Sequence, residues 1–275
     1  MNILLKDTYS PADSNLHLEN VYQRNSDQLI TSKNDVEKIK PFISLTRFTA
    51  RDIPQSSQLT LMPASGKAII TYVMAGEARY SDSTGKHGKL KKDGWCRIMS
   101  GSGMWYSIEP LTSDYVGIEL CIALSPALEN SPPQSTYLDA DPTAPHDPAQ
   151  VLIGWHGKGR SKFATPSLIN YLVVHLNAGQ RWSYEFPLNH QSAWVANVSG
   201  RVRTTDGDLE NNFTLFNKPT ETIEFHAQTD SIFVLGSSPD FDYDLIFQNG
   251  SVHTSSEALH EGAKGISAAL KNVGT

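Results

Sequence analysis

Three histidines in the second half of the chain are the first candidates for chemistry. His175, His190 and His226 lie on or near predicted strands, and imidazoles that converge there could hold a metal ion. Glu224 would point away from His226 in a regular strand, because successive side chains alternate between faces. A single strand histidine is more commonly a hydrogen-bonded structural residue. We therefore expect no metal here and keep a histidine cluster as the alternative.

Two cysteines could carry redox chemistry. Cys96 and Cys121 both lie in apolar, strand-like stretches, where a cysteine usually behaves as a small buried hydrophobic residue. A reactive thiol needs exposure and a lowered pKa, so redox sensing by either cysteine is the alternative interpretation.

Other catalytic signatures are missing from the sequence. It contains no Gly-x-Ser-x-Gly elbow, phosphate loop, paired-cysteine motif or His-Glu-x-x-His. The stretch "GWHGKGR" at 154–160 is rich in glycine and basic, but its spacing is not that of a phosphate-binding loop. We predict a turn there.

The segments that must position these residues are mostly strands. Short runs rich in Ile, Val, Tyr and Phe are separated by turn residues, which favours an all-β sandwich or barrel: "AIITYVMAG", "YVGIELCIAL", "VLIGW", "NYLVVHL", "SAWVANVSG", "ETIEFHA" and "SIFVLGSS". The proline-rich stretch 125–148 suits a connector between two packed units. We predict domains at 1–134 and 135–275.

A helix is predicted at the C-terminus. Thr254-Ser-Ser-Glu257 has the capping-box pattern, and an apolar stripe follows it that Gly262 and Gly265 weaken. We place this helix in the second domain.

The two halves of the chain resemble each other. Gly76, Arg79 and Asp82 recur as Gly200, Arg203 and Asp206, always 124 positions later (200 − 76, 203 − 79, 206 − 82). A duplicated β-barrel explains this repeat.

The chain resembles the pirin-like bicupins, which have two cupin barrels in one chain. The first motif of that family runs roughly His-Pro-His-Arg-Gly, Thr-Tyr-Val, Gly-Glu, Asp-Ser-x-Gly and Gly-x-x-His-Ser-Glu. This sequence keeps the scaffold of the motif, with Pro63, Gly66, Thr71-Tyr72-Val73, Gly76-Glu77, Asp82-Ser83-Thr84-Gly85, Gly101, Gly103 and Ser107. The resemblance covers the chain from about residue 42 onward and implies an all-β protein of two cupin (jelly-roll type) β-barrels with a C-terminal helix.

The resemblance also implies an iron site that this chain lacks. Members with intact ligands bind one iron through three His and one Glu in the N-terminal barrel. Those positions correspond here to Met62, Ala64, Tyr106 and Ile108. Ala and Ile cannot ligate a metal, so we expect no iron or other cofactor and an apolar pocket with the Tyr106 hydroxyl as its polar anchor.

The sequence therefore predicts a pirin-like bicupin without catalytic residues. We expect it to lack dioxygenase activity and to bind a small apolar molecule or a protein partner. One alternative is a quercetin 2,3-dioxygenase-like oxidoreductase with a metal site relocated to second-barrel histidines. A second is a regulatory protein-interaction module, which the resemblance implies for some members.

Charge and hydropathy limit the binding partners and the cellular location that we expect. Scattered charges with a net value of −6 give no basic face for nucleic acid, so we expect no direct DNA or RNA binding. No apolar run is long enough for a signal peptide or a membrane span, which predicts a cytoplasmic protein.

Overall fold

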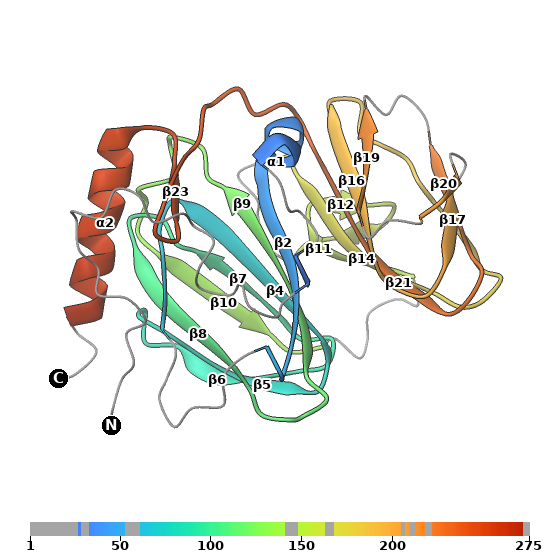
Figure 1. Cartoon of the computed structure of the whole chain (residues 1–275), viewed down its shortest axis with the longest axis horizontal. Helices are drawn as coiled ribbons and strands as arrows, with labels where there is room; N and C mark the ends of the chain where they lie inside the picture. The colour runs from blue at the N-terminus through green and yellow to red at the C-terminus, as the bar shows by residue number, and fades with distance from the viewer. Residues whose placement is uncertain are drawn as a thin grey trace. The chain divides into compact units, whose positions relative to one another are not determined.

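The structure is a computed structural model of the chain (Figure 1). It describes residues 27–28, 33–52, 61–140, 148–162, 168–204, 207–209, 213–217 and 222–271. The predicted repeat residue Asp206 and most of the first 40 residues lie outside these ranges. The described residues form two compact units, and each is built mainly from β-strands. This confirms the predicted all-β class.

Unit 1 draws on residues 1–28, 42–142 and 242–275. Its larger sheet has the strand order β1-β2-β9-β4-β7-β10, and its smaller sheet has the order β3-β8-β5-β6. A hairpin, β22-β23, and helix α2 complete it. The elements are β1 (Asp27–Gln28), β2 (Phe42–Thr49), β3 (Met62–Ala64), β4 (Lys67–Ala75), β5 (Glu77–Asp82), β6 (His87–Lys91), β7 (Trp95–Met99), β8 (Met104–Pro110), β9 (Val116–Ala123), β10 (Gln134–Leu138), β22 (Ile246–Gln248), β23 (Ser251–His253) and α2 (Ser256–Lys271).

Unit 2 draws on residues 29–41 and 143–241. Its sheets have the orders β11-β14-β21-β16-β19 and β15-β20-β17-β18, with a separate β12-β13 hairpin and helix α1. The elements are α1 (Lys33–Ile39), β11 (Ala149–Ile153), β12 (Trp155–His156), β13 (Gly159–Arg160), β14 (Asn170–Leu176), β15 (Arg181–Tyr184), β16 (Ser192–Ser199), β17 (Val202–Thr204), β18 (Gly207–Asp208), β19 (Phe213–Asn217), β20 (Ile223–Ala227) and β21 (Ser231–Ser238).

The second unit repeats the strand order of the first. The order β2-β9-β4-β7 recurs as β14-β21-β16-β19, and β3-β8-β5-β6 recurs as β15-β20-β17-β18. Gly76 and Gly200 both adopt the positive φ that favours glycine, at 71° and 81°. The pairing of β4 is irregular between Val73 and Ala75, and that of β16 is irregular between Asn197 and Ser199, again 124 positions later (197 − 73). The predicted duplication is therefore present in the topology.

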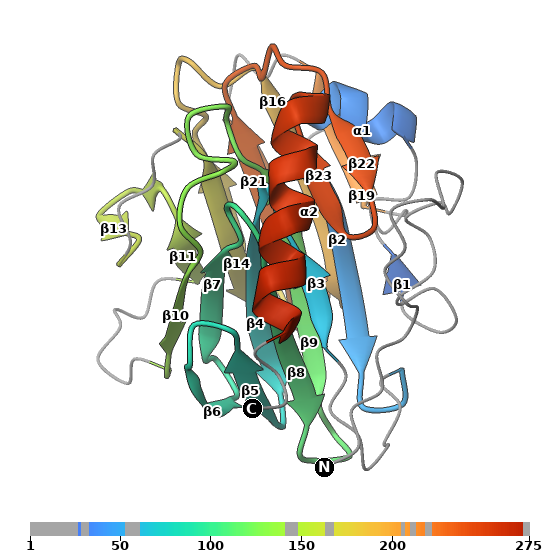
Figure 2. The same ribbon diagram turned by 90° about the vertical axis from the view of Figure 1, so that its left-hand side faces the viewer.

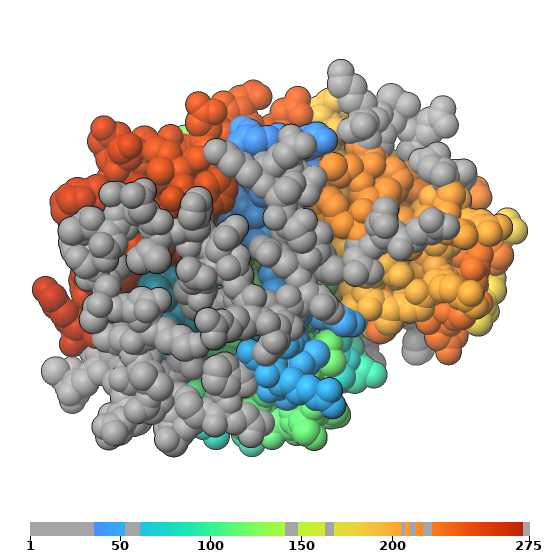
Figure 3. Space-filling model, in the orientation of Figure 1, coloured from blue at the N-terminus to red at the C-terminus, as the bar shows by residue number. Residues whose placement is uncertain are grey.

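The C-terminal helix packs on the first unit, not on the second as predicted from sequence. Helix α2 lies across the outer side of the sheet that carries β3 and β8 (Figure 2). Its buried side comprises Ala258, Gly262 and Ile266, and its outer side chains form the red surface of Figure 3. Hairpin β22-β23 precedes the helix and brings it back to the first unit.

The start of α2 also differs in detail from the predicted capping box. The Ser255 hydroxyl, and not that of Thr254, accepts the hydrogen bond from the Ala258 N–H at 3.1 Å. The Thr254 hydroxyl instead donates to Glu129 at 2.7 Å. The sequence pattern assigns Thr254 to the helix cap, but Thr254 bonds the Glu129 carboxylate, and Ser255 caps the helix instead.

The division between units also lies away from the expected boundary at 134/135. Strand β10 pairs with β7 over Gln134↔Met99 to Leu138↔Trp95, so it belongs to unit 1. Residues 29–41, including α1, belong to unit 2. Residues 125–140 of the predicted proline-rich connector therefore lie within unit 1, because pairing across the sheet and not proline density decides where that unit ends.

Candidate functional site

The four predicted pocket residues lie on the smaller sheet of unit 1. Met62 on β3 is paired with Tyr106 on β8, and Ala64 is paired with Met104. Ile108, two residues beyond Tyr106, is paired with Tyr80 on β5. All four predicted residues are buried. Neighbouring strands therefore bring Met62, Ala64, Tyr106 and Ile108 together on one surface.

A carboxylate that sequence reasoning missed lies opposite Tyr106. Glu119 is on β9 of the larger sheet, and the Tyr106 hydroxyl donates toward its two oxygens at 3.3 and 3.4 Å. The Thr71 hydroxyl on β4 donates to the same carboxylate at 3.3 Å. Because Tyr106 comes from one sheet and Glu119 from the other, these contacts span the interior of unit 1. The available signal was a single charged residue inside the apolar run "YVGIELCIAL".

The environment of Glu119 favours its protonated form. Burial raises the pKa of Glu119, while the positive charge of Lys67 and the hydroxyls of Thr71 and Tyr106 act in the opposite direction. Lys67 and Thr71 are four positions apart on β4, so they share a strand face. The interior near Tyr106 thus contains a carboxyl group and several donors. This corrects the expectation that the Tyr106 hydroxyl is the only polar anchor.

A second polar contact joins the two sheets beside this cluster. The Tyr137 hydroxyl on β10 donates to Asp82 on β5 at 2.8 Å. The rings of Tyr80 and Tyr137 stack with centroids 3.6 Å apart. Burial is the largest cause of the raised pKa of both tyrosines. Both phenols therefore remain neutral near neutral pH, and that of Tyr137 keeps the proton that it donates to Asp82.

Both cysteines are buried free thiols within unit 1. Burial raises the pKa of Cys96 to about 12 and also raises the pKa of Cys121. A thiol that holds its proton is a poor nucleophile. This environment is the one expected for small hydrophobic residues and gives no support to redox sensing.

The corresponding part of unit 2 is apolar. In unit 1 a row of paired residues crosses the larger sheet as Thr46↔Glu119↔Thr71. Val195 lies 124 positions after Thr71 (195 − 71), and its row in unit 2 runs Leu172↔Leu235↔Val195. These three residues are buried hydrophobic side chains. The same topology therefore folds without a polar row at this level, although the next row on the same face, Asn170↔Ser237↔Ala193, includes two buried polar side chains.

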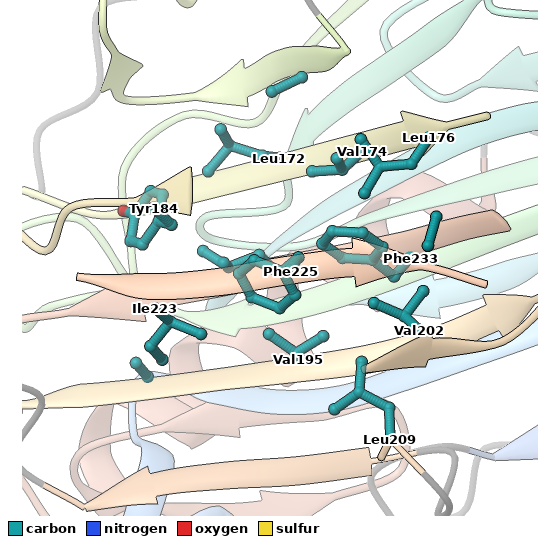
Figure 4. Packing of buried hydrophobic residues seen from close by; sticks show 14 of the residues in the cluster. Leu172, Val174, Leu176, Tyr184, Val195, Val202, Leu209, Ile223, Phe225 and Phe233 are labelled. Carbon is teal, nitrogen blue, oxygen red and sulfur yellow. The ribbon is translucent and has the colours of Figure 1, made fainter. Parts of the chain in front are cut away.

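Aromatic and branched side chains occupy the smaller sheet of unit 2 as well. Strand pairing places Tyr184 opposite Ile223, as Met62 lies opposite Tyr106. Figure 4 shows these side chains directed into one cluster with Phe225, Phe233 and Val195. Phe225 and Phe233 stack with centroids 4.8 Å apart. The interior of unit 2 is a packed core.

This pairing changes the correspondence expected from the repeat spacing. That spacing gives Phe186 and Leu188 as the counterparts of Met62 and Ala64, whereas the register gives Tyr184 and, two residues later, Phe186. Leu188 is fully exposed and outside any strand. At β15 the offset between the two halves is therefore two residues shorter than the 124 positions of the repeat.

The second-half histidines do not converge. His175 is paired with Ile232, whereas His190 bonds the Ser237 hydroxyl through Nδ1 at 2.7 Å. Ile232 and Ser237 are five residues apart on β21, which corresponds to about 16 Å along a strand. His226 lies on the other sheet of unit 2, paired with Arg181 and Arg203. Among the residues that the structure describes, no three His, Cys, Asp or Glu side chains group closely enough to hold a metal ion.

The glycine-rich stretch 154–160 forms the predicted turn. Trp155 pairs with Arg160 and His156 with Gly159, which makes a short hairpin. The Arg160 guanidinium lies 5.2 Å from the centre of the Trp155 ring. This contact directs the Arg160 charge toward an aromatic ring of its own hairpin.

Comparison with known proteins identifies the relatives of this fold. The family model described as Pirin matches residues 22–117. Over these residues the chain is similar to the Pirin family. A "Putative quercetin 2,3-dioxygenase" of Pseudomonas aeruginosa is 25% identical over 241 residues, which cover 82% of this chain and 84% of that protein. A "Pirin-like protein" of Arabidopsis thaliana is 25% identical over 182 residues, and this pirin-like chain spans only 57% of its length.

Solved structures agree with the pirin-like fold. A quercetin 2,3-dioxygenase from Acinetobacter baumannii superimposes with a TM-score of 0.73 at 16% identity, covering 86% of this chain and 88% of that one. The bacterial pirin YhhW from Escherichia coli, in complex with nickel(II), gives 0.62 at 15% identity, covering 78% and 92%. At these identities the likeness shows a shared fold of two cupin β-barrel domains.

Ala64 and Ile108 contain no side-chain donor atom, and the Met62 and Tyr106 side chains are not the imidazoles of the family site. The family's three-His, one-Glu ligand set therefore does not fit these four positions. None of the described helices is both long and apolar enough to cross a bilayer.

Proposed function

We propose that unit 1 binds a small, largely apolar molecule that carries a hydroxyl or similar hydrogen-bonding group. In this proposal the molecule lies between the two sheets, against Met62 and Ile108, and its polar group meets Tyr106 and Glu119. No metal ion takes part at Met62, Ala64, Tyr106 and Ile108, and the chain has no dioxygenase activity.

The contrast between the two units is the observation that carries this proposal. Polar side chains in an interior cost free energy unless they are fully paired. Unit 2 carries Leu235 and Ile223 where unit 1 carries Glu119 and Tyr106. The fold therefore does not require the carboxyl and phenol groups of unit 1. A role in recognition accounts for their presence.

The geometry of Glu119 suits recognition more than packing. Its hydrogen bonds to Tyr106 and Thr71 are long, at 3.3 to 3.4 Å, which is near the outer limit for oxygen donors. Its side chain keeps some accessible surface although it faces the interior. A ligand hydroxyl could form a shorter bond with this carboxyl group, and its apolar part would gain from burial against Met62 and Ile108.

The alternative is a metal-dependent oxidoreductase of the quercetin 2,3-dioxygenase type, which the descriptions of the relatives favour. It would need a metal site at other residues. The separation of His175, His190 and His226 speaks against the second-half histidines as that site. A regulatory protein-interaction module is a further possibility for the same fold, without a surface to assign to it.

Quercetin is a suitable probe because it is flat, mostly apolar and rich in hydroxyl groups. Binding would be measured by isothermal titration calorimetry on chelator-treated protein, with the variant Glu119→Leu. This variant copies the residue that unit 2 has at the corresponding position. The matched control is Glu224→Leu, because Glu224 is exposed on β20 of unit 2.

We expect binding without metal, at least about tenfold weaker in Glu119→Leu and unchanged in the control. No binding by the metal-free protein, together with oxygen uptake once Fe(II) or Ni(II) is added, would reject the proposal in favour of the oxidoreductase. Equal binding by wild type and Glu119→Leu would place the ligand elsewhere.

A further inference from the structure

A buried polar cluster lies beneath helix α2 in unit 1. The Ser65 Oγ is 2.9 Å from His253 Nε2 and 2.8 Å from the Ser251 Oγ. On the other side of the imidazole, His253 Nδ1 is 3.3 Å from a Glu129 oxygen. Ser65 and His253 are completely buried, and Glu129 is nearly so. These groups lie in a row of close polar contacts inside the protein, in which the Nδ1 of His253 is near Glu129 without forming a hydrogen bond.

The members of the cluster come from distant parts of the sequence. Ser65 follows β3, Glu129 lies in the turn after β9, and His253 ends β23. Thr254 adds two bonds to Glu129, because its N–H and its hydroxyl each donate to a different carboxylate oxygen at 2.7 Å. The backbone joins in as well, since the Val252 N–H donates to the Ser65 carbonyl at 3.1 Å. The cluster thus attaches the C-terminal segment to the β-sheets of unit 1.

Two glycines of α2 let the helix approach this cluster directly. A Cβ at Gly262 would lie 2.4 Å from the Ser65 Oγ and 2.5 Å from His253 Nε2. A Cβ at Gly265 would lie 1.8 Å from the Ser102 carbonyl oxygen. Neither contact is sterically possible. The glycines that weaken the helix in isolation are therefore the residues that allow it to pack here.

The order Ser65, His253, Glu129 is that of a serine hydrolase triad, but its surroundings do not suit catalysis. A nucleophile must reach a substrate. The Ser65 hydroxyl has no exposed surface while Gly262 covers it, and both oxygens of Glu129 are already bonded to Thr254. The cluster instead suits the attachment of the C-terminal segment to the sheets of unit 1.

Strand β8 connects the helix to the interior of unit 1. The Trp105 indole N–H donates to the Ala269 carbonyl near the end of α2 at 3.2 Å. Tyr106 is the next residue, and its side chain points to the opposite side, toward Glu119. The packed helix and the Tyr106 phenol are therefore supported by adjacent residues of one strand.

We propose that Ser65, Glu129 and His253 form a polar lock that holds residues 246–271 against unit 1, and that the locked helix fixes β8 and Tyr106. Partial release would leave buried polar groups unpaired, which costs free energy for each group. The segment therefore attaches and detaches as one unit. The lock does not depend on whether the interior binds a ligand.

Hydrogen exchange of the full chain, followed by mass spectrometry, tests the lock. The variants are Glu129→Gln and His253→Gln. The matched control is His260→Gln, a histidine on the exposed side of the same helix. In both lock variants we expect the amides of α2 and β23 to exchange at least about tenfold faster. Strand β14 of unit 2 and the control variant should exchange as in wild type.

Unchanged exchange in α2 would overturn the lock. Equal acceleration in α2 and β14 would overturn it too, since that result means a general loss of stability.

Gly262→Ala tests the same segment without altering any polar group, and Lys264→Ala on the exposed side is its control. We expect the added methyl group to displace α2, to shift the Trp105 indole N–H resonance and to accelerate exchange in β8 more than in β4. Faster exchange in α2 with no change in β8 or Trp105 would reject the link to Tyr106, and an unperturbed helix would reject the close packing itself.

Discussion

The phenol of Tyr106 on one sheet of unit 1 reaches the carboxyl group of Glu119 on the other, with oxygen distances of 3.3 and 3.4 Å. This pair joins the sheets at a level where unit 2 carries Ile223 and Leu235. At this level the two copies of one topology therefore differ in polarity.

Glu119→Leu is expected to raise stability near neutral pH. Burial raises the pKa of Glu119 above its ordinary 4.5, so its contribution to stability is complete below about pH 4.5 and is lost as the pH rises through the higher folded value. A leucine at this position cannot ionise, so the variant does not lose this stability as the pH rises. The melting temperature of the variant should exceed that of wild type by more at pH 8 than at pH 4. Each kcal/mol of added stability should raise the melting temperature by about 2–4 °C. A variant that is less stable at pH 8 would mean that the fold needs the carboxyl group.

Leu235→Glu is the reverse exchange and should be strongly destabilising. Its carboxylate would enter a core that includes Phe225 and Phe233, without the hydroxyls that Glu119 has. We expect a loss of at least about 3 kcal/mol in the free energy of unfolding of unit 2, measured by urea denaturation. Tolerance of this change would show that unit 2 also has room for a polar interior.

Restoring the family's ligand set tests whether the four positions are a former metal site. The variant carries Met62→His, Ala64→His, Tyr106→His and Ile108→Glu. We expect it to retain about one Ni(II) or Fe(II) ion per chain and wild type less than about 0.1, by elemental analysis after gel filtration. The four positions lie on neighbouring strands, where Ala64 is paired with Met104 and Ile108 with Tyr80. If the variant does not bind a metal ion, the four new side chains do not converge on one point.

His190 should titrate far below a normal histidine. Burial lowers its pKa from 6.5 to about 4. The stability that the neutral imidazole contributes is therefore present above pH 6.5 and is lost as the pH falls from 6.5 toward 4. Proton NMR titration of the ring measures the value directly, with His260 as an exposed control. In His190→Asn the fall in stability over this interval should become smaller.

The two thiols should not react in the folded protein. Cys96 and Cys121 are buried, and their pKa values are raised by burial. With Ellman's reagent at pH 8 we expect no fast reaction before unfolding and two reacting thiols in denaturant. Rapid modification of one cysteine in the native chain would reopen a redox role.

Sequence patterns predicted the strands, the duplication and the terminal helix, because alternation, turns and spacing are local properties. They did not predict that α2 packs on unit 1. That choice depends on Gly262 fitting against Ser65 and His253, residues brought together across almost the whole chain. The same limit explains the capping error, since Glu129 competes for Thr254 from 125 positions away.

The candidate site was predicted only in part. The family resemblance supplied Met62 and Tyr106, whose strands are neighbours. Glu119 was missed because the resemblance marks no ligand on its strand, and an isolated charge in an apolar run does not reveal which face it occupies. Pairing with Thr71 on one side and Thr46 on the other is what shows that it belongs to a polar row.

The irregular pairing step shared by β4 and β16 bears on the ancestry of the protein. The same register shift at Val73–Ala75 and at Asn197–Ser199 is the kind of feature that related folds share, and it points to a duplication within the chain. A chimaera built from two second halves would recreate a symmetric progenitor, folded but without a binding interior.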